Sequence, residues 1–141
     1  MALYDVCGTA YYFISKTKGM RFIRSFGFAW NGLKICFTSE TNFRIHVLFT
    51  IAAILLGLVL HVSPAEWLVM LFCIGLVAGM EMMNTAVEKL CNVVQEDIHP
   101  GIKVVKDIAA GAVMVAAGCS LVTGFIIFAP KIIVYFKSLI Y

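Results

Sequence analysis

The sequence has little charge. Of its 141 residues only 13% are Asp, Glu, Lys or Arg, whereas 62% are hydrophobic and the mean hydropathy is +0.96. Soluble domains carry about twice that charged fraction, so the composition excludes an ordinary soluble protein. The length also excludes nucleotide-binding folds of the P-loop or Rossmann size. We therefore expect an all-α membrane protein whose chemistry takes place on helices in or at the bilayer.

Signals for disulfides, cysteine metal sites and nucleic-acid binding are equally scarce. The five cysteines have no CxxC spacing, and we interpret them as small apolar residues: Cys7, Cys36, Cys73, Cys91 and Cys119. The net charge is only +3, and no basic run is interleaved with aromatic residues. We therefore expect no nucleic-acid partner.

Three apolar stretches are long enough to cross a hydrocarbon core, which takes about 20 apolar residues in a helix. We predict spans at about residues 45–62, 65–92 and 107–129. The second span has a marked start, because Ser63-Pro64-Ala65-Glu66 offers an N-cap serine, a proline at the first helical position and a glutamate that completes a capping box. The segment His99-Pro100-Gly101 is a stop signal between the second and third spans.

An amphipathic stretch at about residues 21–38 precedes the spans. At about 100° per residue, Phe26 and Trp30 share an apolar arc, whereas Arg24 and Lys34 lie on another arc. This pattern predicts a surface helix on the inner leaflet. We treat residues 1–20 as an N-terminal extension and residues 21–141 as a single membrane domain.

Basic residues set the expected orientation. Six lysines and arginines precede the first span, none lies in the first turn, three lie at the second connection and two follow the third span. Loops rich in lysine and arginine stay on the cytoplasmic side of a membrane. We therefore expect a cytoplasmic N-terminus and second connection, with the first turn and the C-terminus outside.

Four polar residues interrupt the second span at helical spacing: Glu81, Asn84, Thr85 and Glu88. Offsets of three, four and seven residues from the first member place all of them on one face of a helix. A charged side chain near mid-bilayer costs about 2.5 to 3.5 kcal/mol even on a lenient scale, so two carboxylates on one stripe require a partner or a function. Two interpretations stay open: the stripe holds helices together, or it lines a polar site inside a helix bundle.

Candidate partners for such a site lie on the same cytoplasmic side. Glu40 precedes the first span, and Lys106 and Asp107 begin the third. Carboxylates that converge there could hold a hard cation such as Mg²⁺, which takes oxygen ligands and usually keeps substrate phosphate among them. A neighbouring lysine would then neutralise the phosphate.

The remaining polar and small residues indicate packing. His46 and His61 lie at the two ends of the first span, and neither has an acidic neighbour three or four residues further along, so we assign both to interfacial or packing roles. Gly75 and Gly79 form a GxxxG pattern, which is typical of closely packed membrane helices. Because three short spans leave little room to enclose a site, we expect a homo-oligomer.

The polar stripe also carries a family resemblance. The segment Glu81-Met-Met-Asn84-Thr85-Ala86-Val-Glu88 resembles the E-x-x-N-[ST]-A-[IV]-E signature of the prokaryotic diacylglycerol kinase family, a group of small trimeric membrane lipid kinases. Four further blocks agree in order and approximate spacing: Trp30-Asn31-Gly32-Leu33, Glu40-Thr-Asn42-Phe43-Arg44, Lys106-Asp107-Ile-Ala-Ala-Gly111-Ala-Val113 and Gly124-Phe-Ile-Ile-Phe-Ala-Pro130-Lys131. Together they cover about residues 20–131.

The resemblance implies an ATP-dependent lipid kinase that uses Mg²⁺ and forms a homotrimer in the bacterial inner membrane. Glu81 matches the family's catalytic base, which would take the proton from the lipid hydroxyl, and Asn84 matches the residue that supports the base. Glu40 and Glu88 match its metal-binding carboxylates. The matched nucleotide positions are Arg21, Glu40, Glu88, Lys106 and Asp107, and the matched lipid positions are Trp30 and Glu81.

The lipid substrate has two candidates. The His99-Pro100 pair, the block that opens the third span and the ending Phe128-Ala-Pro-Lys131 look more like the undecaprenol kinase branch, which would make undecaprenyl phosphate. The alternative is diacylglycerol, which would give phosphatidic acid. A competing class is a non-catalytic helical membrane scaffold, in which the polar stripe only packs helices. One departure from the family pattern is Asn92, which stands where an aspartate is usual.

Overall fold

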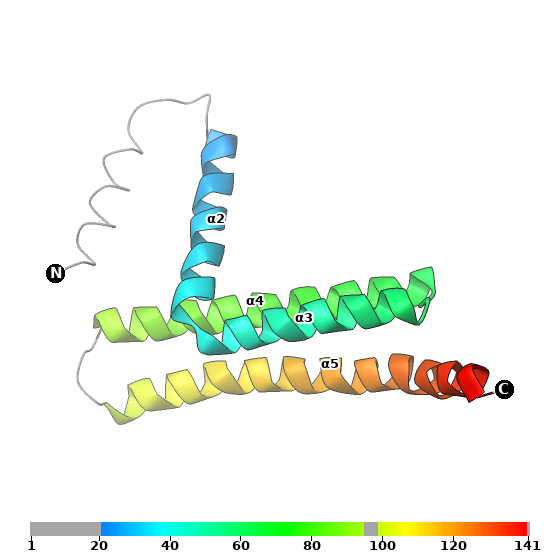
Figure 1. Cartoon of the computed structure of the whole chain (residues 1–141). Helices are drawn as coiled ribbons and strands as arrows, with labels where there is room; N and C mark the ends of the chain where they lie inside the picture. The colour runs from blue at the N-terminus through cyan, green and yellow to red at the C-terminus, as the bar shows by residue number, and fades with distance from the viewer. Residues whose placement is uncertain (1–20, 95–98, 141) are drawn as a thin grey trace. The chain divides into compact units, whose positions relative to one another are not determined.

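The computed structural model describes residues 21–94 and 99–140, and the elements in those ranges are all α-helices (Figure 1). The helices are α2 (Arg21–Ser39), α3 (Thr41–Val59), α4 (Pro64–Val94) and α5 (Pro100–Ile140). The chain divides between Lys34 and Ile35 into two units. The all-helical prediction is confirmed, whereas the predictions on residues 1–20, Cys7 among them, fall outside the described residues.

Three helices are long and apolar enough to cross a membrane, namely α3, α4 and the first 39 residues of α5. Three long apolar helices thus lie where the spans were predicted, and α4 agrees with its predicted bounds within two residues, whereas α3 and α5 differ more. Helix α3 begins at Thr41 and α5 begins at Pro100, so both helices start before their apolar stretches. In α5 the first residue is a proline, whose φ is already suited to the first turn of a helix. Helix α3 ends at Val59, where His61 turns the chain with a left-handed φ of 49°. Helix α5 continues through Pro130.

Helix α2 covers the stretch predicted as a surface helix and ends one residue later, at Ser39. No proline falls within it, so its backbone hydrogen bonds continue without a break. Its location on a membrane surface stays a prediction.

The turn between α3 and α4 contains the predicted capping box. The Ser63 backbone N–H donates to Glu66 Oε2 at 2.6 Å, and the Glu66 backbone N–H donates to Ser63 Oγ at 3.3 Å. The same Oε2 atom lies 3.1 Å from Lys131 Nζ, which comes from α5. One carboxylate therefore caps α4 and ties α5 to its first turn.

Close packing near this turn brings α3 against α4. A cluster of buried residues is formed by Val62, Met70 and Ile127, with Trp67 packed against it. A Cβ atom on Gly57 would lie 3.1 Å from Trp67 Cη2, so the glycine permits the approach of the indole ring. Most other apolar side chains are exposed, as expected for helices whose outer faces meet lipid or neighbouring subunits.

We expect Gly57→Val to lower the apparent melting temperature of the protein in detergent, because over-packing a close contact costs about 1 to 3 kcal/mol. Tryptophan fluorescence during heating measures the effect, since Trp67 is itself at the contact. Gly118→Val is the matched control, because a Cβ there meets nothing within 4 Å among the described residues of the chain. Equal losses in the two variants would contradict a specific close approach at Gly57.

Candidate active site

The polar stripe of α4 faces the other helices of the unit Ile35–Tyr141. Glu81 and Thr85 are buried, each with 3% of its surface exposed, and Asn84 and Glu88 are half-buried. The helical spacing of the four residues produces this shared face, as the sequence predicted. A buried carboxylate in an apolar helix must be compensated, so the surroundings of Glu81 define the candidate site.

A cavity of about 220 Å³ lies beside Glu81. Helix α4 contributes Glu81 and Asn84 to its wall, and α3 contributes Asn42, Ile45 and His46. The wall formed by α5 has no charged, hydroxyl or amide side chain and consists of Ala110, Val113, Met114 and Ala117. Small residues on α5 thus leave space opposite a polar wall, which is the usual arrangement for binding a ligand with a polar end and an apolar body.

His46 provides a polar contact to the buried carboxylate. Its Nε2 atom lies 3.2 Å from Glu81 Oε1. The packing role expected for His46 rested on its lack of an acidic neighbour along its own helix, and that reasoning missed the contact because the partner comes from α4. The signal that could have found this contact is that α3 and α4 each carry a polar residue within an apolar stretch, His46 and Glu81.

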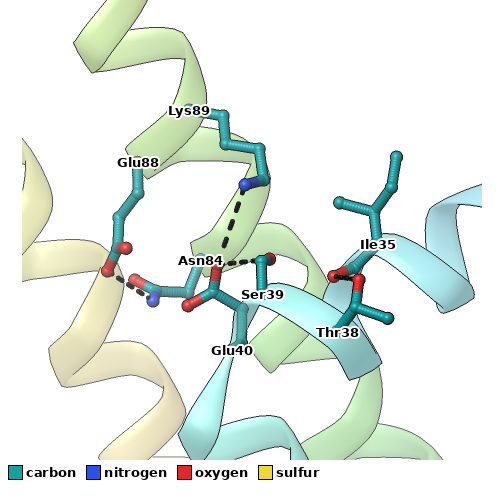
Figure 2. A network of polar contacts seen from close by, with 7 residues as sticks. All are labelled: Ile35, Thr38, Ser39, Glu40, Asn84, Glu88 and Lys89. Carbon is teal, nitrogen blue, oxygen red and sulfur yellow. Dashed lines mark hydrogen bonds and ion pairs between the residues drawn. The ribbon is translucent and has the colours of Figure 1, made fainter. Parts of the chain in front are cut away.

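Two carboxylates besides Glu81 are held by polar contacts, one on the stripe and one at the start of α3, as Figure 2 shows. The Asn84 Nδ2 amide donates to Glu88 Oε1 at 2.9 Å. Glu40 Oε1 accepts a hydrogen bond of 2.8 Å from Ser39 Oγ and lies 3.8 Å from Lys89 Nζ. Glu40 is the N-cap residue of α3, yet its side chain makes no capping hydrogen bond, so the carboxylate is directed toward other groups.

Electrostatics connect these carboxylates to the buried one. The charges of Glu40 and Glu88 are close enough to Glu81 to repel its carboxylate, whereas a hydrogen bond from His46 stabilises it. Like charges that gather in this way are stabilised when a cation or a donor lies between them. The site is therefore suited to a positively charged ligand.

The predicted nucleotide residues are only partly brought together. Lys106 Nζ donates to Asn92 Oδ1 at 2.7 Å, so the lysine at the start of α5 reaches the far end of α4. Asp107 follows it and is exposed. Trp30 is exposed in α2 and belongs to the other unit, and the Arg21 side chain falls outside the described residues.

The oxygen atoms at the site fit a magnesium ion that is held partly by the protein and partly by substrate phosphate and water. Asn84 Oδ1 is buried and has no hydrogen-bond partner, and it lies on the residue that also holds Glu88. Within the residues that the structure describes, no group of three or more His, Cys, Asp or Glu side chains forms a complete metal cage. Mg²⁺ is commonly held by one or two carboxylates together with substrate phosphates and water, so Glu40 and Glu88 fit that role without such a cage.

Known proteins resemble the chain along most of its length. The sequence profile of the family described as "Prokaryotic diacylglycerol kinase" matches residues 27–128. An undecaprenol kinase of Bacillus subtilis (strain 168) is 36% identical over 112 residues, which are 79% of this chain and 91% of the relative. A diacylglycerol kinase of Synechocystis sp. is 34% identical over 110 residues, which are 77% of this chain and 63% of the relative. The Escherichia coli (strain K12) diacylglycerol kinase is 24% identical over 103 residues, 73% of this chain and 84% of the relative.

We expect Asn84→Asp to destabilise the protein, because it replaces the amide donor with a carboxylate that repels Glu88. Breaking a hydrogen bond to a charged group costs about 1.5 to 3 kcal/mol, and the apparent melting temperature in detergent should fall accordingly. Asn92→Asp is the matched control, because it introduces the same negative charge next to a positively charged group. Lys106 Nζ lies 2.7 Å from Asn92 Oδ1. That variant should keep the melting temperature or raise it. Equal shifts in both variants would contradict the donor role of the Asn84 amide.

Proposed function

The chain belongs to the prokaryotic diacylglycerol kinase family, and from this premise we propose that it transfers the γ-phosphate of ATP to undecaprenol, giving undecaprenyl phosphate. The observation that carries the proposal is the buried Glu81 carboxylate on the wall of a cavity of about 220 Å³, which has room for the hydroxyl end of a lipid. A lipid kinase needs such a group at membrane depth, since the hydroxyl that it phosphorylates stays with the lipid. Diacylglycerol is the second candidate substrate.

Two observations favour undecaprenol over diacylglycerol. The Bacillus subtilis relative, which is 36% identical, is an undecaprenol kinase. The α5 wall of the cavity also lacks hydrogen-bonding side chains apart from the weak thioether of Met114. A polyprenol carries one hydroxyl and no other polar group, whereas diacylglycerol carries two ester groups whose carbonyls call for donors. The apolar wall thus suits the simpler headgroup.

Glu81 is the proposed catalytic base. As the lipid oxygen attacks the γ-phosphorus, the bond from that phosphorus to the bridging oxygen breaks and ADP leaves. The hydroxyl proton passes to the Glu81 carboxylate. Phosphoryl transfer asks a protein mainly to position the reactants and to neutralise charge, so a base and a few charged groups suffice without a Walker loop.

The remaining predicted residues have supporting roles in the same proposal. Glu40 and Glu88 would hold Mg²⁺, and Asn84 orients Glu88 through its amide at 2.9 Å. The ion, when bound, neutralises phosphate charge during transfer. Lys106 would contact phosphate after exchanging its bond to Asn92. Asp107 and Arg21 would also contact the nucleotide, as the family resemblance implies. Trp30 would contact the lipid, as the family resemblance implies.

We further propose a homotrimer in the bacterial cytoplasmic membrane, with the N-terminus in the cytoplasm. The distribution of lysine and arginine supports this orientation. Added Cβ atoms on Gly75 and Gly79 would meet nothing within 4 Å among the described residues, so this GxxxG face of α4 is available to a second copy. A second copy there would also enclose the helices that carry the site.

The decisive experiment supplies the purified protein in mixed micelles with magnesium, γ-labelled ATP and either undecaprenol or diacylglycerol. We expect label in undecaprenyl phosphate. Label chiefly in phosphatidic acid would instead assign diacylglycerol as the substrate, and no label in either lipid from a folded oligomer would favour the scaffold.

Glu81→Ala should reduce the rate by about 10²- to 10⁴-fold while the protein still assembles, since it removes only the base. Glu66→Ala is the matched control, because it removes another paired carboxylate from the same helix, at the opposite end from the site. That variant should lose stability and keep its rate per folded oligomer. Equal rates in the two variants would contradict the assignment of Glu81 as the base.

Glu88→Ala should weaken nucleotide binding in a magnesium-dependent way, because it removes one of two proposed ligand carboxylates. Titration of a fluorescent ATP analogue at several magnesium concentrations measures this effect. Glu81→Ala is the comparison variant and should bind Mg-ATP normally, since the base contacts the lipid. Normal Mg-ATP binding by Glu88→Ala would contradict the metal assignment.

A further inference from the structure

His46 has no part in the reaction outlined above, although it lies beside the proposed base. We propose that His46 is a positioning residue for Glu81: its Nε2–H holds the carboxylate Oε1, so that Oε2 is left to accept the proton of the lipid hydroxyl. The inference rests on the proposed function and assigns a further residue to the same reaction. Its basis is the arrangement of groups around one buried carboxylate.

The two atoms lie within hydrogen-bond distance of each other. His46 Nε2 lies 3.2 Å from Glu81 Oε1, and the exposed fractions of the two side chains are 27% and 4%. An ionised carboxylate only accepts hydrogen bonds, so the facing ring nitrogen carries the hydrogen. Both side chains also line the same cavity, which places the contact at the surface that a lipid headgroup would meet.

No other described group performs this task for Glu81. The Asn84 amide nitrogen, on the same helix, already donates to Glu88 Oε1, and the remaining Asn84 oxygen cannot donate. Helix α5 presents only alanine, valine and methionine to the cavity. The nearby charges of Glu40 and Glu88 repel the buried carboxylate. Among the residues that the structure describes, His46 is therefore the side chain in hydrogen-bond contact with the base.

A fixed carboxylate is a better base than a rotating one, because proton transfer requires a short and aligned contact with the lipid hydroxyl. Loss of one hydrogen bond to a charged group corresponds to about a 10- to 100-fold change in an equilibrium or rate. The loss should appear in kcat, because the proposed role of His46 is to orient the base and not to bind ATP or the lipid chain. The KM values for ATP and for lipid should change little.

The test compares two substitutions at this position. His46→Leu fills similar space without a donor and should lower kcat by about 10- to 100-fold with KM retained. His46→Gln places an amide N–H near the position of Nε2 and should retain kcat within about 3-fold of the unsubstituted protein. Rescue by the amide distinguishes a hydrogen bond from mere space filling. If His46→Leu fails to assemble, His46→Asn replaces it, since the shorter amide does not reach Glu81.

Thr50→Val is the matched control on α3. Thr50 lies one helical turn after His46, is half-buried and does not line the cavity, so its substitution should leave kcat unchanged. In a Glu81→Ala background, His46→Leu should add no further loss, because a positioning residue acts only through the base that it positions.

Three results would overturn the inference. If His46→Leu has a normal kcat while the unsubstituted protein is active, the inference fails and the proposed function stands. The same holds if the rate of His46→Gln is as low as that of His46→Leu. A full additional loss in the Glu81→Ala background assigns His46 a separate role. Absence of label in both lipids from the unsubstituted protein would overturn the proposed function, and this inference with it.

Discussion

The packing of the three long helices has to accommodate one buried carboxylate, that of Glu81. Glu81 lies in the interior of α4 with 3% of its surface exposed, where an unpaired charge would be strongly unfavourable. Its compensation requires a donor from α3, and His46 supplies it at 3.2 Å. The space beside the pair requires small residues on α5, and Ala110 and Ala117 provide it. Each of the three helices thus contributes to the surroundings of this one side chain.

Contacts at the two ends of α4 set the register in which the site forms. At one end Glu66 caps the helix and contacts Lys131 of α5 at 3.1 Å, and at the other end Lys106 of α5 bonds to Asn92 at 2.7 Å. Together these contacts fix α5 against α4 over a length that includes Glu81. Each exposed pair contributes little stability alone, but paired constraints at both ends oppose sliding of one helix along the other. Substrate-binding walls built from two helices need such registration.

Sequence patterns predicted the parts of this arrangement that lie within one helix. The Ser63 to Glu66 capping box, the three spans and the shared face of Glu81 and Glu88 follow from spacing along the chain, and the structure contains them. The contacts of His46 with Glu81 and of Lys106 with Asn92 were not predicted, because periodicity states which residues share a face and leaves open which face of a neighbour they meet. The ends of α2 and α4 were predicted within two residues, whereas α5 continues at both ends beyond the apolar stretch that hydropathy marks. The proposed roles of Arg21 and Trp30 stay predictions.

The polar residues of α4 follow one another along the helix in the order in which the reacting groups of the proposed reaction would lie. Glu81 is buried beside an apolar wall, where a lipid hydroxyl can reach it without leaving the membrane. Glu88 lies seven residues further along the same face, or about 10 Å at the helical rise, and Asn92 lies one turn beyond it. The helix thus passes from the proposed base to a proposed metal ligand and then to a residue that holds Lys106. A nucleotide that approaches from the Asn92 end of α4 would first meet Lys106 and the cation at Glu88. Its terminal phosphate would then extend toward Glu81.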